Sequence, residues 1–208
     1  MSRRNNPYAG DARTRQAKAA GYPARSVFKL REIDERLHLL APGQHVLDLG
    51  AAPGSFSLYA SQRVGKKGRV VAIDLQPIAQ EFAPNVSVMQ GDALDLDEAA
   101  LSVAAPYDVV LSDMAPSTSG NKVRDQARSF ELFMRALQVA TALGREGSSF
   151  AGKLFMSSDF PEAKRAVGAG YQSCKVIRPR ATRQNSSELF VVGMGLKSSQ
   201  KADEEPGS

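Results

Sequence analysis

The sequence has few of the residues that build disulfides and metal cages. Cys174 is the single cysteine among 208 residues, and tryptophan is absent. One cysteine cannot form an internal disulfide, and it excludes a cysteine-based zinc cage. The two histidines, His38 and His45, are not plausible metal ligands as a lone pair. We therefore predict no metal site.

Long apolar runs are also absent. No stretch approaches the roughly 20 uninterrupted apolar residues that span a membrane. The amino terminus, Met1–Pro7, is basic and has no apolar block behind it, so it does not read as a secretory signal. The hydrophobic fraction of 42% is ordinary for a domain with a real core. These features predict one globular cytoplasmic domain without a membrane partner.

Positive charge is concentrated in two segments of a chain whose net charge is +5. Between Arg3 and Arg31 Asp11 is the single acid, and the second segment contains none. The bases of the two segments are Arg3, Arg4, Arg13, Arg15, Lys18, Arg25, Lys29 and Arg31, then Lys175, Arg178, Arg180 and Arg183. A solvated surface would account for such charge, but two strongly basic clusters flanking a catalytic-looking core favour contacts with nucleic-acid phosphates. We assign RNA binding to Arg25, Arg178, Arg180 and Arg183.

Strand and helix patterns alternate along most of the chain. Helices are expected from near Pro23 and at 53–64, 125–143 and 161–167. Strands are expected at 45–49, 69–74, 86–90, 107–113, 149–155, 171–177 and 189–194. This order predicts an α/β, Rossmann-like fold, with a mostly parallel sheet, helices on both faces and an antiparallel edge strand. Residues 1–21 are expected to be a flexible basic arm, 22–195 the domain and 196–208 a disordered tail.

Aspartates follow several of the expected strands. The segment Asp48–Gly54 ends the first strand and opens a helix, and Asp74, Asp92 and Asp113 follow the next three. Ligands of open parallel sheets bind at the carboxyl ends of strands, so these side chains should share one cleft. Each aspartate alone is better explained as a helix cap or a turn residue, and only the four together favour a cofactor cleft.

The ligand of this cleft is not expected to be a dinucleotide. The loop lacks the Gly-x-Gly-x-x-Gly fingerprint, and no phosphate-binding Gly-x-x-x-x-Gly-Lys-[Ser/Thr] loop exists. Several aspartates would also repel phosphates. S-adenosylmethionine has a cationic sulfur, a ribose and an adenine, and it suits an acidic cleft.

Five motifs in order resemble those of the FtsJ-type RNA ribose 2′-O-methyltransferases, over roughly residues 22–195. They are Arg25–Leu30, Asp48–Phe56, Ser112–Gly120, Lys153 within Phe150–Phe155, and Arg183–Glu188. The resemblance implies a catalytic tetrad of Lys29, Asp113, Lys153 and Glu188. It implies S-adenosylmethionine contacts from Asp48, Gly50, Gly54, Phe56, Asp74, Asp92 and Asp113. Ser55 and Phe56 depart from the family pattern, in which a glycine and a tryptophan are common.

The chemistry of the tetrad agrees with this implied activity. A ribose hydroxyl is a weak acid, so methyl transfer needs a group that accepts its proton. A desolvated lysine, or one beside a second cation, is more easily neutral. We therefore hypothesise that Lys153 is the base, that Lys29 and Glu188 orient it or the ribose, and that Asp113 serves both Lys153 and the cofactor.

Resemblance to the bacterial branch of the family implies a uridine of 23S ribosomal RNA, within the large subunit. We expect the enzyme to be a monomer. Transfer RNA or messenger RNA remain alternative substrates. A non-catalytic RNA-binding assembly factor is a second class of function, but an intact tetrad speaks against it. A nicotinamide-dependent dehydrogenase is a third, and the missing dinucleotide fingerprint speaks against that.

Overall fold

The computed structural model describes residues 9–198 apart from positions 97, 118, 184 and 185. Its strands are β1 (His45–Leu49), β2 (Arg69–Asp74), β3 (Val86–Gln90), β4 (Tyr107–Ser112), β5 (Gly144–Phe155), β6 (Tyr171–Ile177) and β7 (Glu188–Leu196). Its helices are α1 (Ala9–Ala19), α2 (Val27–Leu37), α3 (Ser55–Val64), α4 (Glu98–Leu101), α5 (Lys122–Leu143) and α6 (Phe160–Gly170). The described helices include none long and apolar enough to cross a membrane.

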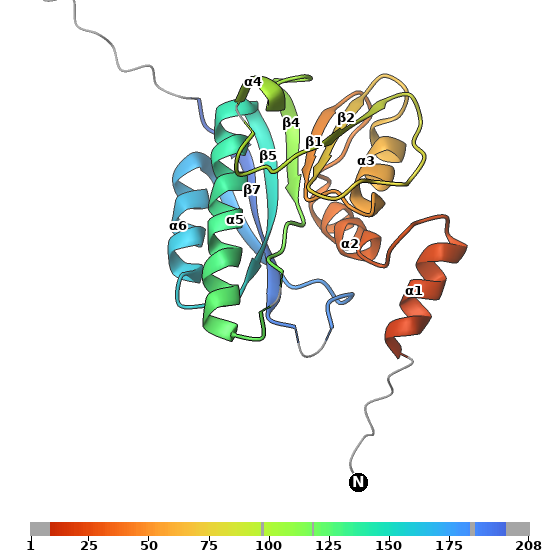
Figure 1. Cartoon of the computed structure of the whole chain (residues 1–208). Helices are drawn as coiled ribbons and strands as arrows, with labels where there is room; N and C mark the ends of the chain where they lie inside the picture. Colours follow the sequence, from red (N-terminus) through yellow and green to blue (C-terminus); the bar gives the residue numbers. More distant parts are fainter. Residues whose placement is uncertain (1–8, 97, 118, 184–185, 199–208) are drawn as a thin grey trace, which may run out of the picture.

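All seven strands belong to one sheet, in the order β3-β2-β1-β4-β5-β7-β6. Helices α5 and α6 cover one face, and α2 and α3 cover the other (Figure 1). Two apolar cores result: one includes Phe133 of α5, and the other includes Leu30 of α2. Burial on both faces explains why the central strands β1, β2 and β4 read as continuous apolar runs, whereas β3 at the edge is largely exposed.

The predicted fold class is confirmed, with a refinement at one edge. Strands β3, β2, β1, β4 and β5 pair in parallel. Strand β7 runs antiparallel to both of its neighbours, β5 and β6. The antiparallel strand therefore lies one place in from the edge, and β6 is the edge strand. The connection from β6, residues 178–187, lets β7 turn back and insert between β6 and β5.

The start of helix α3 differs from the predicted range. The helix begins at Ser55 rather than Pro53, because Gly54 before it has a φ of +107° and cannot belong to the helix. That left-handed conformation is one that glycine adopts at little cost. Pro53 therefore belongs to the loop after β1. Gly54, with its positive φ, is the residue between this loop and helix α3.

The amino-terminal arm contains a helix that the sequence analysis did not predict. Residues Ala9–Ala19 form α1, whose alanine, arginine, lysine and glutamine residues have high helix propensity. Apolar periodicity is weak because, among the side chains described at positions 12–19, Ala17 alone is buried. The Tyr22 N–H donates to the Ala17 carbonyl at 2.9 Å and ends the arm. Residues 1–8 and 199–208 of the predicted arm and tail lie outside the described residues.

A buried carboxylate fixes helix α2 against helix α3. Asp34 is 2% exposed and interrupts the apolar stripe of α2. Its oxygens accept hydrogen bonds from the Leu40 N–H at 2.8 Å, the Tyr59 hydroxyl at 2.9 Å and the Arg63 Nε at 2.9 Å. The aspartate therefore has a structural role within the helix that carries Lys29.

Replacing this carboxylate should destabilise the fold. Asp34→Ala leaves two buried donors and one guanidinium without their acceptor, so we expect the free energy of unfolding to fall by about 3 kcal/mol. Urea denaturation measures the change. The exposed neighbour Glu35 supplies the control, because Glu35→Ala should have little effect. Equal losses in both variants would contradict the assigned role of the network.

Candidate active site

Two lysines and two carboxylates form one ion-paired group at the carboxyl ends of the central strands. Lys29 Nζ lies 2.6 Å from Glu188 Oε1, and Lys153 Nζ lies 2.9 Å from Asp113 Oδ1. Lys29 Nζ also lies 4.0 Å from Asp113 Oδ1, which joins the two pairs. All four side chains are largely buried. The two positive charges are balanced by two negative ones, as burial requires.

Each member of this group is held by a different element. Lys29 belongs to the first turn of α2, and Lys153 to β5. Asp113 directly follows β4, and its N–H donates to the Leu49 carbonyl of β1 at 3.2 Å. Glu188 begins β7, and its Oε1 accepts from the Thr182 hydroxyl at 3.1 Å. Antiparallel pairing of β7 with β5 brings the start of β7 to the end of β5, which places Glu188 near Lys153.

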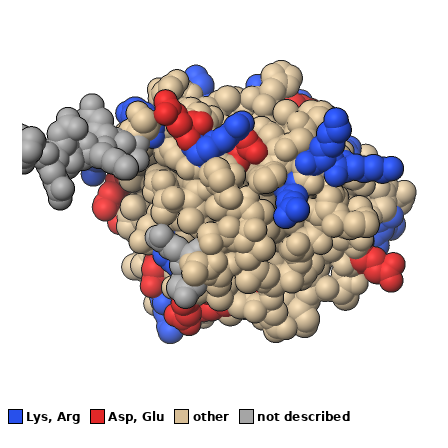
Figure 2. All heavy atoms as spheres, turned by 90° about the horizontal axis from the view of Figure 1, so that it is seen from above, with Lys and Arg blue, Asp and Glu red and all other residues tan. Residues whose placement is uncertain are grey.

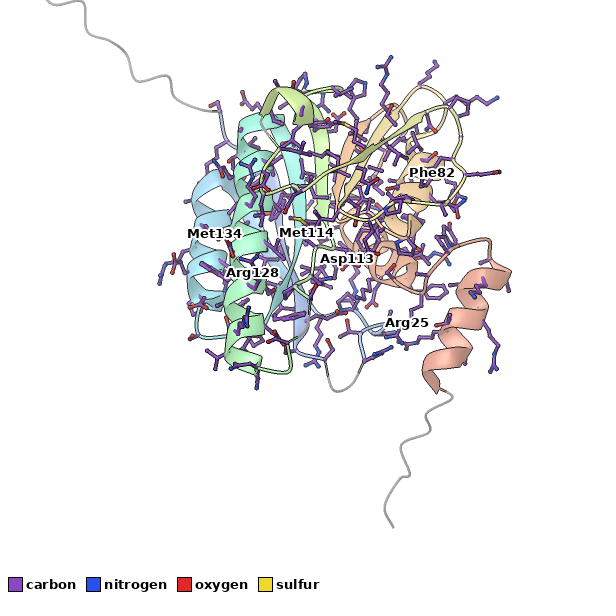
Figure 3. All side chains as sticks on the ribbon, in the orientation of Figure 1. Arg25, Phe82, Asp113, Met114, Arg128 and Met134 are labelled. Carbon is purple, nitrogen blue, oxygen red and sulfur yellow. The ribbon has the colours of Figure 1, made fainter. Side chains whose placement is uncertain are left out.

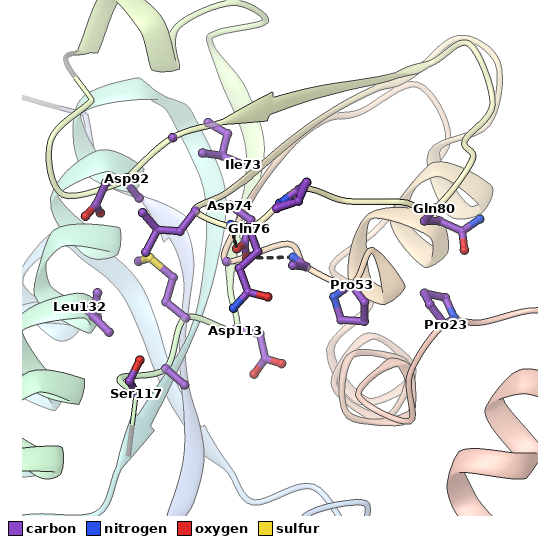
Figure 4. A pocket seen from close by; sticks show the side chains of 18 of the residues that line it. Pro23, Pro53, Ile73, Asp74, Gln76, Gln80, Asp92, Asp113, Ser117 and Leu132 are labelled. Atoms are coloured by element: carbon purple, nitrogen blue, oxygen red, sulfur yellow. Dashed lines mark hydrogen bonds between the residues drawn. The ribbon is translucent and has the colours of Figure 1, made fainter. Parts of the chain in front are cut away.

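A larger cavity of about 640 Å³ opens beside this group. Asp74, Asp92 and Asp113 line it together with Gly50, so the structure brings four of the predicted cofactor residues to one place (Figure 4). The volume is in the range of small-molecule sites. Ile73, Met114 and Leu132 supply an apolar wall on the same cavity.

The Asp74 carboxylate is fixed by two backbone donors. Its Oδ2 accepts from the Ala52 N–H at 2.9 Å, and its Oδ1 accepts from the Gln76 N–H at 2.8 Å (Figure 4). Each oxygen keeps a lone pair, so the group can accept from two neighbouring hydroxyls, as on a ribose. Asp92 is anchored in a similar way, because its Oδ1 accepts from the Leu94 N–H at 2.9 Å. Its second oxygen can accept from an exocyclic amine.

Gly50 shows why the loop after β1 needs small residues. It has a φ of +76°, and a Cβ atom built on it would lie 2.7 Å from the Met114 side chain and 2.8 Å from the Met114 backbone. Any side chain at position 50 would displace the segment after β4. The glycine therefore allows the loops after β1 and β4 to meet at the floor of the larger cavity.

A second, basic cavity of about 340 Å³ adjoins the ion-paired group on its other side. It is lined by Arg25, Lys29, Arg183, Ser186 and Glu188. Partial burial lowers the pKa of Arg25, and the positive charges of Arg183 and Arg13 lower it further. The nearby carboxylate of Glu188 opposes this shift, so the guanidinium groups repel one another and are only partly balanced by a negative charge.

The chain is similar to known proteins over most of its length. Residues 22–196 match the model of a family described as FtsJ-like methyltransferase. A ribosomal RNA large subunit methyltransferase E from Sorangium cellulosum is 58% identical over 94% of this chain and 93% of its own. The protein of that name from Nitratidesulfovibrio vulgaris strain Miyazaki F is 47% identical over 90% and 95%. The chain belongs to the FtsJ-like methyltransferase family.

Solved structures agree with this fold. A ribosomal RNA methyltransferase of Plasmodium falciparum has a TM-score of 0.73 at 23% identity, with 84% of this chain and 98% of that one covered. Fibrillarin of Aeropyrum pernix, solved with S-adenosyl-L-methionine, has a TM-score of 0.54 at 16% identity, with 75% and 68% covered. At these identities the likeness extends to the fold alone. This FtsJ-like methyltransferase uses S-adenosylmethionine as its methyl donor, which the acidic cavity fits.

Three predicted cofactor residues are absent from the lining of the larger cavity. Asp48 is fully buried beneath the loop after β1. Gly54 is covered by Gln80 and Phe82, whose side chains a Cβ atom at that position would meet at 2.9 Å. Phe56 is 3% exposed and stacks on Phe190 of β7, with ring centroids 6.3 Å apart. The Phe56 ring, which the resemblance placed at the cofactor, is therefore a core contact that does not line the cavity, because helix α3 turns this side chain away from it.

Other lining residues were not predicted. Leu75, Gln76, Pro77, Ala79 and Gln80 of the segment after β2 line the larger cavity, as does Pro23 before α2. This segment has neither regular structure nor charged residues at these five positions, so periodicity and charge give no signal for it. A polar, proline-containing connection directly after an aspartate that ends a strand was the one available indication.

The predicted RNA-binding arginines are divided by the structure. Arg25 and Arg183 reach the basic cavity, whereas Arg178 and Arg180 are exposed outside its lining. Arg178 donates to the Ser186 carbonyl at 2.6 Å, and the Arg180 N–H donates to Glu32 at 2.7 Å. These two contacts position the connection between β6 and β7.

Asp48 should make the stability of this enzyme depend on pH. Its pKa is raised from 3.8 to about 7, mainly by burial. The nearby carboxylates of Asp113 and Asp74 contribute to this rise, and the hydrogen bond from Ser57 opposes it. A carboxyl whose folded-state pKa is raised binds its proton more tightly in the folded state. Its contribution to stability is therefore complete below about pH 4 and is lost as the pH rises through about 7.

We expect the free energy of unfolding of the wild type, minus that of Asp48→Asn, to fall between about pH 4 and 7. The asparagine cannot ionise, and the other titrating groups are common to both proteins. Urea denaturation across this range measures the difference. A difference that stays constant or grows with pH would show that Asp48 is already ionised in the folded protein.

Proposed function

We propose that this enzyme transfers the methyl group of S-adenosylmethionine to a ribose 2′-hydroxyl, that of a uridine, in 23S ribosomal RNA. One observation carries the proposal: the ion-paired group joins the two cavities. Asp113 lines the larger, acidic cavity, and Lys29 and Glu188 line the basic one. A cationic methyl donor and a polyanionic acceptor would thus meet across the tetrad. The names of the relatives support large-subunit ribosomal RNA as the acceptor.

The reaction requires the 2′-oxygen to attack the methyl carbon in line with the departing sulfur. S-adenosylmethionine supplies the methyl group. The hydroxyl proton passes to Lys153 as the carbon–oxygen bond forms and the carbon–sulfur bond breaks. Lys153 is placed for this role because its side chain is 6% exposed and its Nζ lies 2.9 Å from the carboxylate of Asp113, which also lines the cofactor cavity. To accept the proton, it must act as the neutral amine.

Lys29 and Glu188 hold the acceptor in this scheme. Their pair lies on the basic cavity, where a cation and a carboxylate 2.6 Å apart can donate to and accept from ribose hydroxyls. Asp113 links that pair to Lys153, so the positions of base and acceptor are set by one carboxylate. Such fixed alignment accounts for a large part of the acceleration in group transfer.

The basic cavity is the entry that RNA would use. Arg13 of α1 donates to the Arg180 carbonyl at 2.7 Å, which joins α1 to the connection between β6 and β7. Figure 1 shows this connection extending towards α1, and Figure 3 shows Arg25 between α1 and the sheet. The two basic clusters of the sequence therefore meet around one cavity. Arginine side chains bind phosphate with bidentate geometry, which would orient the backbone and leave base selection to RNA shape.

At the opposite end of the molecule, the two signs of charge are mixed. Figure 2 looks down on the end where β4 and β5 begin, and there basic and acidic side chains are interspersed. Arg145 and Asp108, for example, form an ion pair at this end.

We include in the proposal that the enzyme works as a monomer in the cytoplasm, on RNA within the large ribosomal subunit. Transfer RNA as substrate and a non-catalytic assembly role are the alternatives that the first experiment separates.

Lys153 variants test the reaction. Large ribosomal subunits lacking the modification are incubated with methyl-labelled S-adenosylmethionine, and the label is located. Lys153→Ala should lower the single-turnover rate by about 10²-fold or more. Lys153→Arg should lose as much, because a guanidinium keeps the charge but cannot be deprotonated. Lys197→Ala, at a lysine that bonds the Gly168 and Ala169 carbonyls, is the control.

Each outcome of this assay has a meaning. Substantial activity in Lys153→Arg would contradict a proton-accepting role and leave an electrostatic one. Label on transfer RNA but not on the subunits would keep the chemistry and move the substrate. Cofactor binding without label on any RNA would favour the non-catalytic alternative. Thermal melting of each variant checks that the fold persists.

Charge reversal in the basic cavity tests the RNA path. Arg25→Glu with Arg183→Glu should weaken RNA binding and reduce the dependence of its logarithm on salt concentration by about one unit per lost phosphate contact. Cofactor affinity should stay unchanged, because neither arginine lines the larger cavity. Lys66→Glu with Lys67→Glu, just before β2 at the opposite end of the strands, is the matched control. Equal losses from the two pairs would contradict a defined path.

A further inference from the structure

A buried hydroxyl joins the start of helix α3 to the segment that leads to Lys29. Ser55 Oγ accepts a hydrogen bond from the Ala24 N–H at 2.8 Å and donates one to the Ala24 carbonyl at 3.1 Å. Ser55 is 1% exposed, so water does not compete for these bonds. One side chain thus satisfies both backbone groups of a residue 31 positions earlier.

Both ends of this bridge reach the site. Pro53, two residues before Ser55, lines the larger cavity, and so does Pro23 beside Ala24. Arg25, on the other side of Ala24, lines the basic cavity. The bridge therefore connects the loop after β1, on the cofactor side, with a segment that contacts both cavities.

The first turn of helix α2 has no side-chain cap of its own. Ser26 occupies the N-cap position but makes no side-chain capping bond. The first turn is instead held by backbone bonds, including one from the Lys29 N–H to the Ser26 carbonyl at 2.9 Å. An uncapped helix start frays easily. The bond from Ser55 to Ala24, two residues before Ser26, fixes the chain at the point where this turn begins.

We propose that Ser55 is a positioning residue that holds Lys29 in register with the cofactor loop. The inference rests on the role proposed above for Lys29. Ser55 touches neither cavity, so it acts through the backbone of Ala24 and the first turn of α2. The family pattern commonly has glycine here, which has no hydroxyl. The bridge is therefore built from a residue in which this chain departs from the family pattern.

The test is a double-mutant cycle on the single-turnover methylation rate. Ser55→Ala should lower the rate roughly tenfold by misplacing Lys29, with a much smaller change in the dissociation constant for S-adenosylmethionine. In a Lys29→Ala background, the same Ser55→Ala change should alter the residual rate by less than about twofold. A structural role without positioning would lower the rate equally in both backgrounds.

Ser61→Ala is the matched control. Ser61 is another buried serine of α3, and its hydroxyl donates to Asn85 Oδ1 at 2.7 Å, away from the Lys29 segment. Both alanine variants should lose similar stability, but Ser61→Ala should keep the wild-type rate. Amide hydrogen exchange adds a readout independent of activity: the Ala24 N–H should exchange faster in Ser55→Ala and unchanged in Ser61→Ala.

The results separate this inference from the proposed function. An undiminished rate in Lys29→Ala would overturn the role of Lys29 and, with it, that of Ser55. Suppose that Lys29→Ala lowers the rate strongly, but that Ser55→Ala either leaves the rate unchanged or lowers it equally in both backgrounds. The role of Lys29 would then stand, and the inference about Ser55 alone would be overturned. Unchanged Ala24 exchange in Ser55→Ala would also overturn it. Coupled rate losses with faster Ala24 exchange would support it.

Discussion

The carboxylate of Asp113 lies at the centre of the site. It faces Lys153 at 2.9 Å and Lys29 at 4.0 Å, and the same residue lines the cavity that fits S-adenosylmethionine. Without this charge, two largely buried ammonium groups would repel each other with one carboxylate, that of Glu188, left to compensate. The sheet supplies the arrangement, because parallel strands end at one edge and the antiparallel β7 begins at that same edge.

Burial at this point has both a cost and a use. Charged groups taken out of water need partners, and the four members of the tetrad supply them to one another. In the proposed mechanism, the same shielding lets Lys153 take its proton from a ribose hydroxyl instead of from solvent. Acidic residues gather on the cofactor side and basic ones on the acceptor side, so the charge of each cavity matches the ligand proposed for it.

Sequence patterns predicted the sheet, and the four residues that the family resemblance implied as a tetrad lie close together in the structure, for identifiable reasons. Apolar runs such as Val70–Ile73 can satisfy their burial in few ways, and an aspartate after such a run must lie at the carboxyl edge. Phe56 shows the limit, because position in a motif does not tell which face of α3 the ring occupies. The joining of α1 to Arg180 through Arg13 was also beyond prediction, since it depends on a contact between residues 167 positions apart.

The central claim is that proton transfer to Lys153 accompanies methyl transfer, and the pH dependence of the single-turnover rate tests it most directly. With saturating RNA and S-adenosylmethionine, the rate should rise as the pH is raised from about 6 to 10, because a base must lose its own proton before it can accept one. The rise should persist in Asp48→Asn, which removes a carboxyl group whose pKa is raised to about 7. A rate that is flat across this range would contradict a lysine base and leave the tetrad with orientation alone.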